Sequence, residues 1–302
     1  MAAPEHYASP LAFKTALEAR IRRVAPDAMP RLRQLLIFDR FLVRIFTVFG
    51  ERVILKGGLV LELRLARART TKDIDLRLTG NPADLLERLQ EAGRLELGDW
   101  LIFDVAPDRK HPVMEGEGLV YQGQRFRVNA RLAQKPYGDP FGLDVGLADA
   151  LTAEPDEVLG SEFFEFVALE RPRFLVYPRV THVAEKLHAY TLPRERENSR
   201  VKDLPDLALL AQTGPFAAAA LRQALERTFE FRGTHPLPAS LPPPPESWTE
   251  TYARTARQDQ LPWPTLAEVT AAARAFLDPL LADAVETWVP EDWGWEPKLS
   301  AS

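Results

Sequence analysis

The sequence of 302 residues contains no cysteine, which excludes disulfide bonds and thiolate-ligated metal sites. No apolar stretch approaches the roughly 20 residues that a membrane-spanning helix needs. The first residues, MAAPEHYASP, lack the basic region and apolar run of a signal peptide. From these absences we expect a soluble, cytoplasmic protein with no membrane partner.

An excess of positive charge is also missing from the sequence. Its 38 Lys and Arg residues face 43 Asp and Glu residues, which leaves a formal net charge of −5. The whole chain therefore exerts no attraction on nucleic acid, and any RNA binding requires a local basic surface. Hydrophobic residues make up 46% and charged residues 27%, the balance of a folded protein.

Hydrophobic periodicity changes along the chain and predicts two lobes. Helical spacing predicts helices over 31–49, 59–65, 83–92, 180–190, 204–211 and 216–229, and in later segments up to Trp288. Alternation predicts strands over 52–55, 74–78, 101–105, 126–132, 141–147 and 163–169. The six prolines within 235–246 predict an extended connector. We therefore expect an α/β core with N-terminal helices over residues 1–178 and a helical lobe over residues 179–302.

Two aspartates separated by one residue, Asp73 and Asp75, carry the strongest chemical signal. On a strand both side chains leave the same face, with Cα atoms about 6.6 Å apart, which allows them to ligate Mg²⁺ or flank a metal pair. Nucleotidyl and phosphoryl transfer need such oxygen ligands, because a hard cation neutralises triphosphate charge and activates the attacking oxygen. A lone Asp-x-Asp is more often a solvated strand end, so the interpretation depends on the neighbouring motifs.

A glycine pair, Gly57 and Gly58, lies between a predicted strand and a predicted helix. A backbone without side chains can approach phosphates closely, and a helix N-terminus offers free N–H donors. Either motif alone is weak evidence for a nucleotide site. The glycine pair followed by the aspartate pair at this spacing occurs much more rarely by chance. Lys56 and Arg69 flank these motifs and are candidates to assist in binding phosphates.

A third carboxylate, Asp144, is a candidate to complete the metal site. In the strand predicted over 141–147 the apolar residues share one face, and Asp144 falls on the other between Gly142 and Gly146. The glycines leave room for a ligand. A charged residue on a solvated sheet face explains the pattern equally well.

The predicted helices after residue 179 add a lysine and an acid. Lys186 borders the apolar stripe of its helix and can reach an anionic ligand, although a surface lysine along the core edge is the commoner case. Asp203 suits an N-cap, whereas Asp206 lies inside its helix without that explanation and can point toward the site. Residues 193–202 hold four basic and two acidic residues, as in either a phosphate-facing loop or a solvated linker.

At these residues the sequence resembles the AbiEii/AbiGii nucleotidyltransferase toxins, which include the MenT-type toxins that modify tRNA. The matching blocks are LKGG at 55–58, RTTKDID at 69–75, EKLHA at 185–189 and KDLPDL at 202–207. The blocks occur in the family's order over roughly residues 31–210, with a weaker continuation to Trp248 and Tyr252.

The resemblance implies an α+β fold, in which a polymerase-β-type nucleotidyltransferase core with a mixed or antiparallel sheet joins a C-terminal α-helical lobe. It assigns metal binding to Asp73 and Asp75, and the essential lysine and last essential acid to Lys186 and Asp206. Gly57 and Gly58 match the phosphate-binding turn. The wider superfamily often has Gly-Ser at this turn, so one phosphate contact of the superfamily is missing here.

Thr71 matches a hydroxyl position that the cognate antitoxin phosphorylates in some family members, which adds negative charge where the nucleotide binds. The activity that the resemblance implies is transfer of a nucleotide from a nucleoside triphosphate, with Mg²⁺ or Mn²⁺, onto RNA. The implied acceptor is the tRNA 3′ end, the implied partner is an antitoxin, and the implied setting is a toxin–antitoxin or phage-defence system.

Two other functions agree with the same residues. A kinase-like phosphotransferase needs identical metal ligands and differs only in which phosphorus is attacked. A non-catalytic nucleotide- or RNA-binding protein uses the same surface without turnover. The mass of the product distinguishes the first alternative from nucleotidyl transfer, and the loss or retention of toxicity in an Asp73→Ala variant distinguishes the second.

Overall fold

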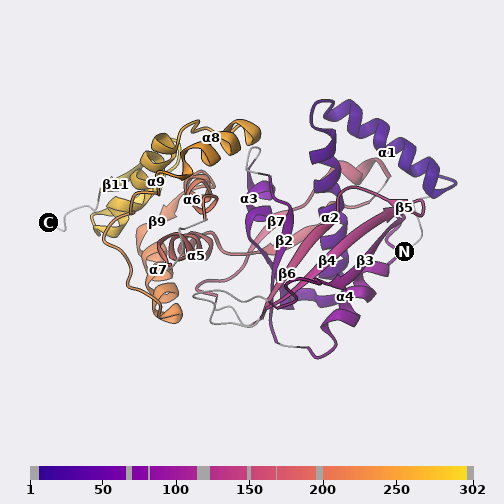
Figure 1. Cartoon of the computed structure of the whole chain (residues 1–302), viewed down its shortest axis with the longest axis horizontal. Helices are drawn as coiled ribbons and strands as arrows, with labels where there is room; N and C mark the ends of the chain where they lie inside the picture. The colour runs from indigo at the N-terminus through magenta and orange to yellow at the C-terminus, as the bar shows by residue number, and fades with distance from the viewer. Residues whose placement is uncertain are drawn as a thin grey trace.

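The computed structural model describes residues 7–65, 70–80, 82–113, 123–147, 151–167, 169–194 and 200–297. Figure 1 shows two lobes side by side along the long axis of the molecule, one built on a large sheet and one mainly of helices. We call them the core lobe and the helical lobe. Among the described residues, no helix combines the length and apolar character needed to cross a bilayer.

The core lobe contains the N-terminal helices and the large sheet. Its helices are α1 (Pro10–Val24), α2 (Met29–Phe49), η1 (Gly50–Arg52), α3 (Gly58–Arg64), α4 (Leu85–Arg94) and η2 (Phe163–Val167). Its strands are β1 (Val53–Lys56), β2 (Asp73–Leu78), β3 (Leu101–Pro107), β4 (Gly123–Leu132), β5 (Lys135–Pro136), β6 (Phe141–Leu147), β7 (Asp156–Leu159) and β8 (Arg173–Val176).

The sheet is mixed, with strand order β3-β4-β6-β2-β1-β8-β7 and β5 paired to β4. The pairs β2–β6 and β1–β8 are parallel, and the other pairs are antiparallel. The mixed sheet confirms the predicted fold class. It also places β2 and β6, which are far apart in sequence, next to each other at the centre of the sheet.

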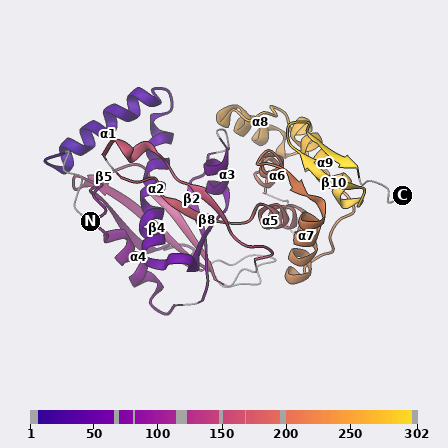
Figure 2. The ribbon, with the colours of Figure 1, turned by 180° about the vertical axis from the view of Figure 1, so that it is seen from behind.

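Helix α2 covers one face of this sheet. Figure 2 shows α2 crossing in front of the strands. The ring of Phe38 lies 4.9 Å from that of Phe141, and the ring of Phe41 lies 5.1 Å from that of Phe103, so α2 packs directly on β6 and β3. Side chains alternate along each strand. The residues between these core positions therefore point to the opposite face, which we call the site face.

The helical lobe follows β8 and has its own hydrophobic core. It contains α5 (Arg179–Thr191), α6 (Asp203–Ala211), α7 (Ala218–Arg232), α8 (Trp248–Asp259) and α9 (Leu266–Leu281), with short strands β9 (Phe216–Ala217), β10 (Val285–Val289) and β11 (Gly294–Pro297). Residues 235–246 form no helix or strand, as their prolines predict. The helix α3 lies between the large sheet and the helical lobe in both views (Figures 1 and 2).

Two predictions of secondary structure were wrong. The strand expected over 163–169 is instead the 3-10 helix η2, in which Phe163, Phe164 and Val167 are buried, a spacing that suits a helical turn rather than alternation. The region after residue 179 is not wholly helical, because β9, β10 and β11 form a small antiparallel sheet. Trp288 of β10 is fully buried, and its indole N–H donates to the carbonyl of Ala211 at 2.8 Å, so tertiary packing selects the strand.

Helix α4 also differs in its boundaries from the sequence expectation. It begins at Leu85 rather than Ala83, and it continues through Gly93 to Arg94. A Cβ atom on Gly93 would lie 2.2 Å from the carbonyl oxygen of Phe103. Gly93 therefore permits close contact between α4 and β3 and does not end the helix.

Candidate functional site

Four charged residues from adjacent strands form a row across the site face. Lys56 of β1 is the Cα partner of Asp75 on β2, Asp75 is the partner of Asp144 on β6, and Asp144 is the partner of Arg125 on β4. Partners in register point to the same face of a sheet. Two carboxylates therefore lie between two cations, and the parallel pairing of β2 and β6 brings the carboxylates together.

Asp73 lies on the same face, one pleat from Asp75. Its Oδ1 accepts a hydrogen bond of 3.1 Å from the backbone N–H of Gly142, the residue that is its Cα partner on β6. A Cβ atom on Gly142 would lie only 2.6 Å from this oxygen. Gly142 was expected to leave room around Asp144, but in the structure it makes room for the carboxylate of Asp73.

Gly57 is adapted to Asp75 in the same way. Its φ of +73° favours glycine, and a Cβ atom there would lie 1.9 Å from Asp75 Oδ2. Gly58 is buried and is the first residue of α3. The backbone therefore passes directly beside the central carboxylate, as a phosphate-binding turn requires, and phosphate binding by Gly57 and Gly58 remains a prediction.

The pKa of Asp75 is shifted by its buried position and by the charged residues around it. Burial, followed by the negative charge of Asp144, raises the pKa of the Asp75 carboxyl above its ordinary value, while Lys56 and Lys186 act in the opposite direction. Lys186 belongs to α5, so the helical lobe contributes to the electric field at the acids of the core lobe. A bound cation would relieve the repulsion between the neighbouring carboxylates.

Arg125 binds Asp144 through two hydrogen bonds. Its Nε donates to Asp144 Oδ1 at 2.7 Å, and its Nη2 donates to Oδ2 at 2.8 Å. The bonds to Asp144 raise the pKa of Arg125. Sequence analysis did not identify Arg125, because only the register of β4 against β6 reveals this pair. A metal-ligand role for Asp144 remains a prediction, and such a role requires at least one of these oxygens to leave Arg125.

Lys186 is held by two acids of α6. Its Nζ lies 2.8 Å from Asp203 Oδ1 and 2.8 Å from Asp206 Oδ2, and Asp206 is fully buried. The prediction that Asp203 caps the helix was wrong, because α6 begins at Asp203 itself and the carboxylate binds Lys186 instead. Asp206 therefore holds the ammonium group of Lys186 in place, and its part in catalysis remains a prediction.

The segment before Asp73 contacts both lobes. The backbone N–H of Thr71 donates to Glu62 Oε1 at 2.6 Å, and its hydroxyl donates to the carbonyl oxygen of Asp73 at 3.3 Å. The hydroxyl of Thr70 donates to Asp259 of α8 in the helical lobe at 2.8 Å. Arg69 lies outside the described residues, so its phosphate-binding role stays a prediction.

Two further features lie near α5. His188 packs against Phe229 and His235, and burial lowers its pKa to about 4, so this side chain belongs to the interior of the helical lobe. The basic segment 193–202 is only partly described, because residues 195–199 lie outside the described ranges. Its role therefore stays open.

Within the described ranges, no three Asp, Glu or His side chains converge in a geometry that would enclose a metal ion. Mg²⁺ commonly uses only one or two protein carboxylates and takes its other ligands from substrate phosphates and water. Asp73 and Asp75, on one face of one strand and beside Gly57, fit that donor set. They do not by themselves form a complete cage.

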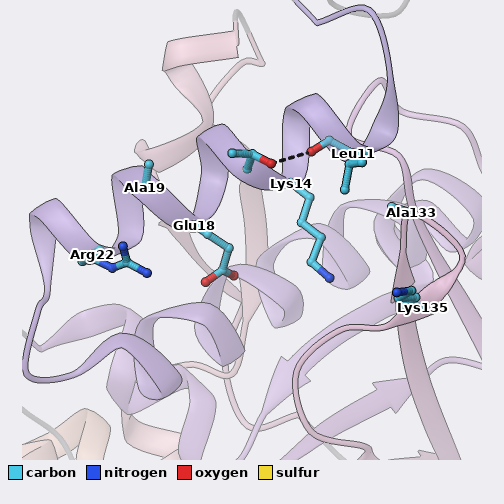
Figure 3. A pocket seen from close by; sticks show the side chains of 8 residues that line it. Leu11, Lys14, Glu18, Ala19, Arg22, Ala133 and Lys135 are labelled. Carbon is cyan, nitrogen blue, oxygen red and sulfur yellow. Dashed lines mark hydrogen bonds between the residues drawn. The ribbon is translucent and has the colours of Figure 1, made fainter.

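A hollow elsewhere in the core lobe runs along α1. It is lined by Leu11, Lys14, Thr15, Glu18, Ala19, Arg22, Ala133 and Lys135, as Figure 3 shows. The carboxylate of Glu18 lies between the side chains of Lys14 and Arg22 in this view (Figure 3). None of the predicted site residues lines the hollow, so it is separate from the candidate site.

Comparisons with known proteins identify the family and the fold of the chain. A model of the family described as "Nucleotidyl transferase AbiEii toxin, Type IV TA system" matches residues 40–295. The structure of the nucleotidyltransferase toxin MenT4 from Mycobacterium tuberculosis H37Rv matches with a TM-score of 0.54 and 17% identity, over 91% of this chain and 92% of that chain. JHP933 from Helicobacter pylori matches with a TM-score of 0.48 and 15% identity, over 83% and 94%. No curated protein matches the chain.

Proposed function

Because the chain belongs to the AbiEii family of nucleotidyltransferase toxins, we propose that it transfers a nucleotide from a nucleoside triphosphate onto the 3′ end of an RNA, with tRNA as the acceptor. The observation that supports this proposal is the row of Lys56, Asp75, Asp144 and Arg125, which we call the catalytic row, with Asp73 beside it. The catalytic row brings two carboxylates and two cations together, and the backbone at Gly57 passes beside them. Nucleotidyl transfer requires such carboxylates to hold a metal ion and such positive groups to bind phosphates.

Asp73 and Asp75 would hold the Mg²⁺ or Mn²⁺ ion on which we expect the reaction to depend. When bound, such an ion neutralises the negative charge of the triphosphate and activates the attacking oxygen. Asp144 would join these ligands after separating from Arg125. Burial, and then the negative charge of Asp144, raises the pKa of Asp75, and a divalent cation beside these carboxylates would offset both effects.

The basic residues and the glycine turn would bind the triphosphate. Lys186 would stabilise negative charge on the phosphates, assisted by Lys56, while the backbone at Gly57 and Gly58 lies against them. The acids Asp203 and Asp206 fix the Lys186 ammonium before substrate arrives, so the charge needs little reorganisation during the reaction.

The proposed reaction forms one bond and breaks one bond. A hydroxyl oxygen of the acceptor attacks the α-phosphorus, and the bond between the α-phosphorus and the oxygen bridging to the β-phosphate breaks. Pyrophosphate leaves, and the hydroxyl proton passes to water. The family match favours this reaction over transfer of the γ-phosphoryl group by a kinase-like enzyme.

The experiment that tests the function incubates purified protein with Mg²⁺, total tRNA and one nucleoside triphosphate at a time, labelled on either the α- or the γ-phosphate. Label transferred to tRNA from the α-phosphate alone supports nucleotidyl transfer and identifies the preferred base. Transfer from the γ-phosphate alone would establish the kinase-like alternative. Binding without transfer would establish the non-catalytic one.

Matched variants complete this experiment. Asp73→Asn removes one carboxylate charge at the site, and Asp84→Asn removes one at an exposed position where the side chain makes no cap hydrogen bond. We expect the first variant to lose at least about 100-fold in transfer rate. The second should keep wild-type activity.

We further propose that the protein acts in the cytoplasm, where tRNA and nucleoside triphosphates are present, as part of a toxin–antitoxin or phage-defence system. Its cognate antitoxin would silence it by phosphorylating Thr71, whose hydroxyl bonds to the carbonyl of Asp73. A phosphate there would place negative charge beside the acids. Thr71→Val keeps the size of the side chain, so we expect an active enzyme that co-expressed antitoxin no longer modifies, as measured by intact mass.

A further inference from the structure

We propose that the site face of β4 binds the sugar-phosphate backbone of the RNA acceptor, chiefly through Arg127 and Arg131. This inference rests on the proposed function and adds the location of the acceptor. The strand lies between β6 and the edge strand β3, and its outward side chains supply a local basic surface on a chain whose net charge is −5.

Buried and outward-pointing side chains alternate along β4, and the outward-pointing ones form the proposed surface. Phe126, Val128, Ala130 and Leu132 are buried in the core, whereas Arg125, Arg127, Asn129 and Arg131 point to the site face. Successive outward side chains are about 6.6 Å apart along the strand. Three guanidinium groups and one amide therefore follow one line that begins at the catalytic row. The only cation of this line that bonds a catalytic-row acid, among the described residues, is Arg125.

Arg127 is the next cation of this line after Arg125, and it lies across β6 from Asp73. It is the Cα partner of Gly142, and Gly142 is the Cα partner of Asp73. The Cα atoms of Arg127 and Asp73 are thus two strand spacings, about 10 Å, apart. The residue between them on β6 is Gly142, so β6 places no side chain between them. The exposed guanidinium of Arg127 can therefore reach a ligand that lies over Asp73.

The chemistry of transfer places the acceptor on this side. In nucleotidyl transfer the attacking oxygen and the leaving pyrophosphate lie on opposite sides of the phosphorus, roughly in line. The groups proposed to hold the leaving phosphates, Lys56 and Lys186, belong to β1 and the helical lobe. Arg127 lies on the opposite side of Asp73 from β1, because the strand order is β4-β6-β2-β1. The attacking hydroxyl therefore approaches from β4.

Arg131 extends the surface away from the reaction centre. Its guanidinium lies 3.5 Å from Asp104, and the two side chains are 47% and 56% exposed. An ion pair this exposed contributes little to stability, so the guanidinium can exchange the carboxylate for a phosphate. Ile102, its Cα partner on β3, is 48% exposed and offers an apolar surface beside it.

The hollow along α1 is a weaker location for the acceptor. It also contains basic side chains, but its Lys135 is the Cα partner of Leu132, whose side chain is buried in the core. Lys135 therefore points to the opposite face of the sheet from the catalytic row. An acceptor bound there would have to pass around the sheet edge to reach Asp73.

The test measures RNA binding directly, without turnover. Fluorescence anisotropy of a labelled tRNA and of a single-stranded RNA is recorded over a range of salt concentrations for wild type, Arg127→Gln and Arg131→Gln. The control is Arg94→Gln, which removes an exposed cation at the end of α4. Binding of a nucleoside triphosphate with Mg²⁺ and the melting temperature are measured for each variant, so that a folding defect is recognised.

We expect each β4 variant to bind RNA about tenfold more weakly, since each loses a charge-assisted contact. The magnitude of the slope of log K against log salt should fall by about 0.7 per lost contact. Nucleotide binding and melting temperature should stay at wild-type values, and Arg94→Gln should match wild type throughout. Wild-type RNA affinity and slope in both β4 variants would overturn the inference, as would a wild-type protein that binds no RNA.

This design separates the two proposals. RNA binding that depends on β4, in a protein that transfers no nucleotide, would support the binding surface and contradict the proposed reaction. Nucleotide transfer to RNA with wild-type KM for RNA in Arg127→Gln and Arg131→Gln would support the reaction and contradict the surface.

Discussion

Lys186 of α5 lies 2.8 Å from a carboxylate oxygen of each of two acids of α6, Asp203 and Asp206. The acids are three residues apart on one helix, so their side chains reach the same ammonium from one face. The position of Lys186 is therefore set within the helical lobe, while its charge acts on Asp75 in the core lobe. Variants of Lys186, Asp203 and Asp206 should therefore be able to change the stability of the protein and its activity independently.

We expect Lys186→Met to lower the free energy of unfolding by about 3 kcal/mol, because it leaves two buried carboxylates without their cation. Transfer activity should fall by roughly 100-fold or more. Lys186→Met combined with Asp206→Leu should recover part of the stability and none of the activity. Urea denaturation and transfer assays of the single and double variants measure both effects, and recovery of activity in the double variant would contradict the role of Lys186.

Gly57→Ala should inactivate the enzyme, because a Cβ atom there would lie 1.9 Å from Asp75 Oδ2. Gly80→Ala is the matched control. Gly80 also has a positive φ, +85°, but a Cβ atom added there would have no other atom within 4 Å. Both variants should lose about 1–3 kcal/mol of stability from the positive φ, and only Gly57→Ala should lose activity by roughly 100-fold or more. Equal activity of the two variants would show that the approach of the backbone to Asp75 is unimportant.

Arg125→Gln should bind Mn²⁺ more tightly than wild type. The substitution frees both oxygens of Asp144, which Arg125 holds at 2.7 and 2.8 Å. The gain should disappear in an Arg125→Gln/Asp144→Asn double variant. Titration of Mn²⁺ followed by electron paramagnetic resonance measures the affinity, and an unchanged affinity in Arg125→Gln would argue against Asp144 as a metal ligand.

Asp39 of α2 should make the core lobe less stable as pH rises from about 4 to about 6. Burial raises the pKa of its carboxyl to about 6, although the backbone N–H of Ser161 donates to Oδ2 at 2.8 Å. Because the folded pKa lies above the unfolded value, the native state binds more protons in this window, and the stabilisation is lost as the carboxyl ionises.

The variant Asp39→Asn tests this pH dependence. Its stability relative to wild type should improve by about 2 kcal/mol between pH 4 and pH 7, which is most of the free energy equivalent of the pKa shift. Denaturation of both proteins at the two pH values measures the difference. A constant difference between the proteins would show that the Asp39 carboxyl has the same pKa in the folded and unfolded states.

The local part of the site could be predicted from sequence. The order of β1, α3 and β2 follows from short-range periodicity, and alternation along β2 places Asp73 and Asp75 on one face. Gly57 was identified as a phosphate-binding turn, but its contact with Asp75 depends on the pairing of β1 with β2. Local patterns give the face of a side chain and not its neighbour on another strand.

The remaining part of the site depends on contacts between distant segments. Arg125 was missed because its partner is set by the register of β4 on β6, which no local pattern encodes. Asp203 was assigned to a helix cap, since the helix start alone does not show that Lys186 lies opposite. Trp288 was placed in a helical region, where burial against the helical core selects a strand.

One side chain of the core lobe, Leu61 of α3, is fully buried within the hydrophobic cluster of the helical lobe. A fragment ending after β8 would expose this leucine to solvent, and a fragment beginning at α5 would lack part of its interior. The stability of α3, and of the turn at Gly57 and Gly58 where α3 begins, is therefore coupled to the helical lobe. We expect truncation of the chain after β8 to destabilise this turn as well as to remove Lys186 and Asp206.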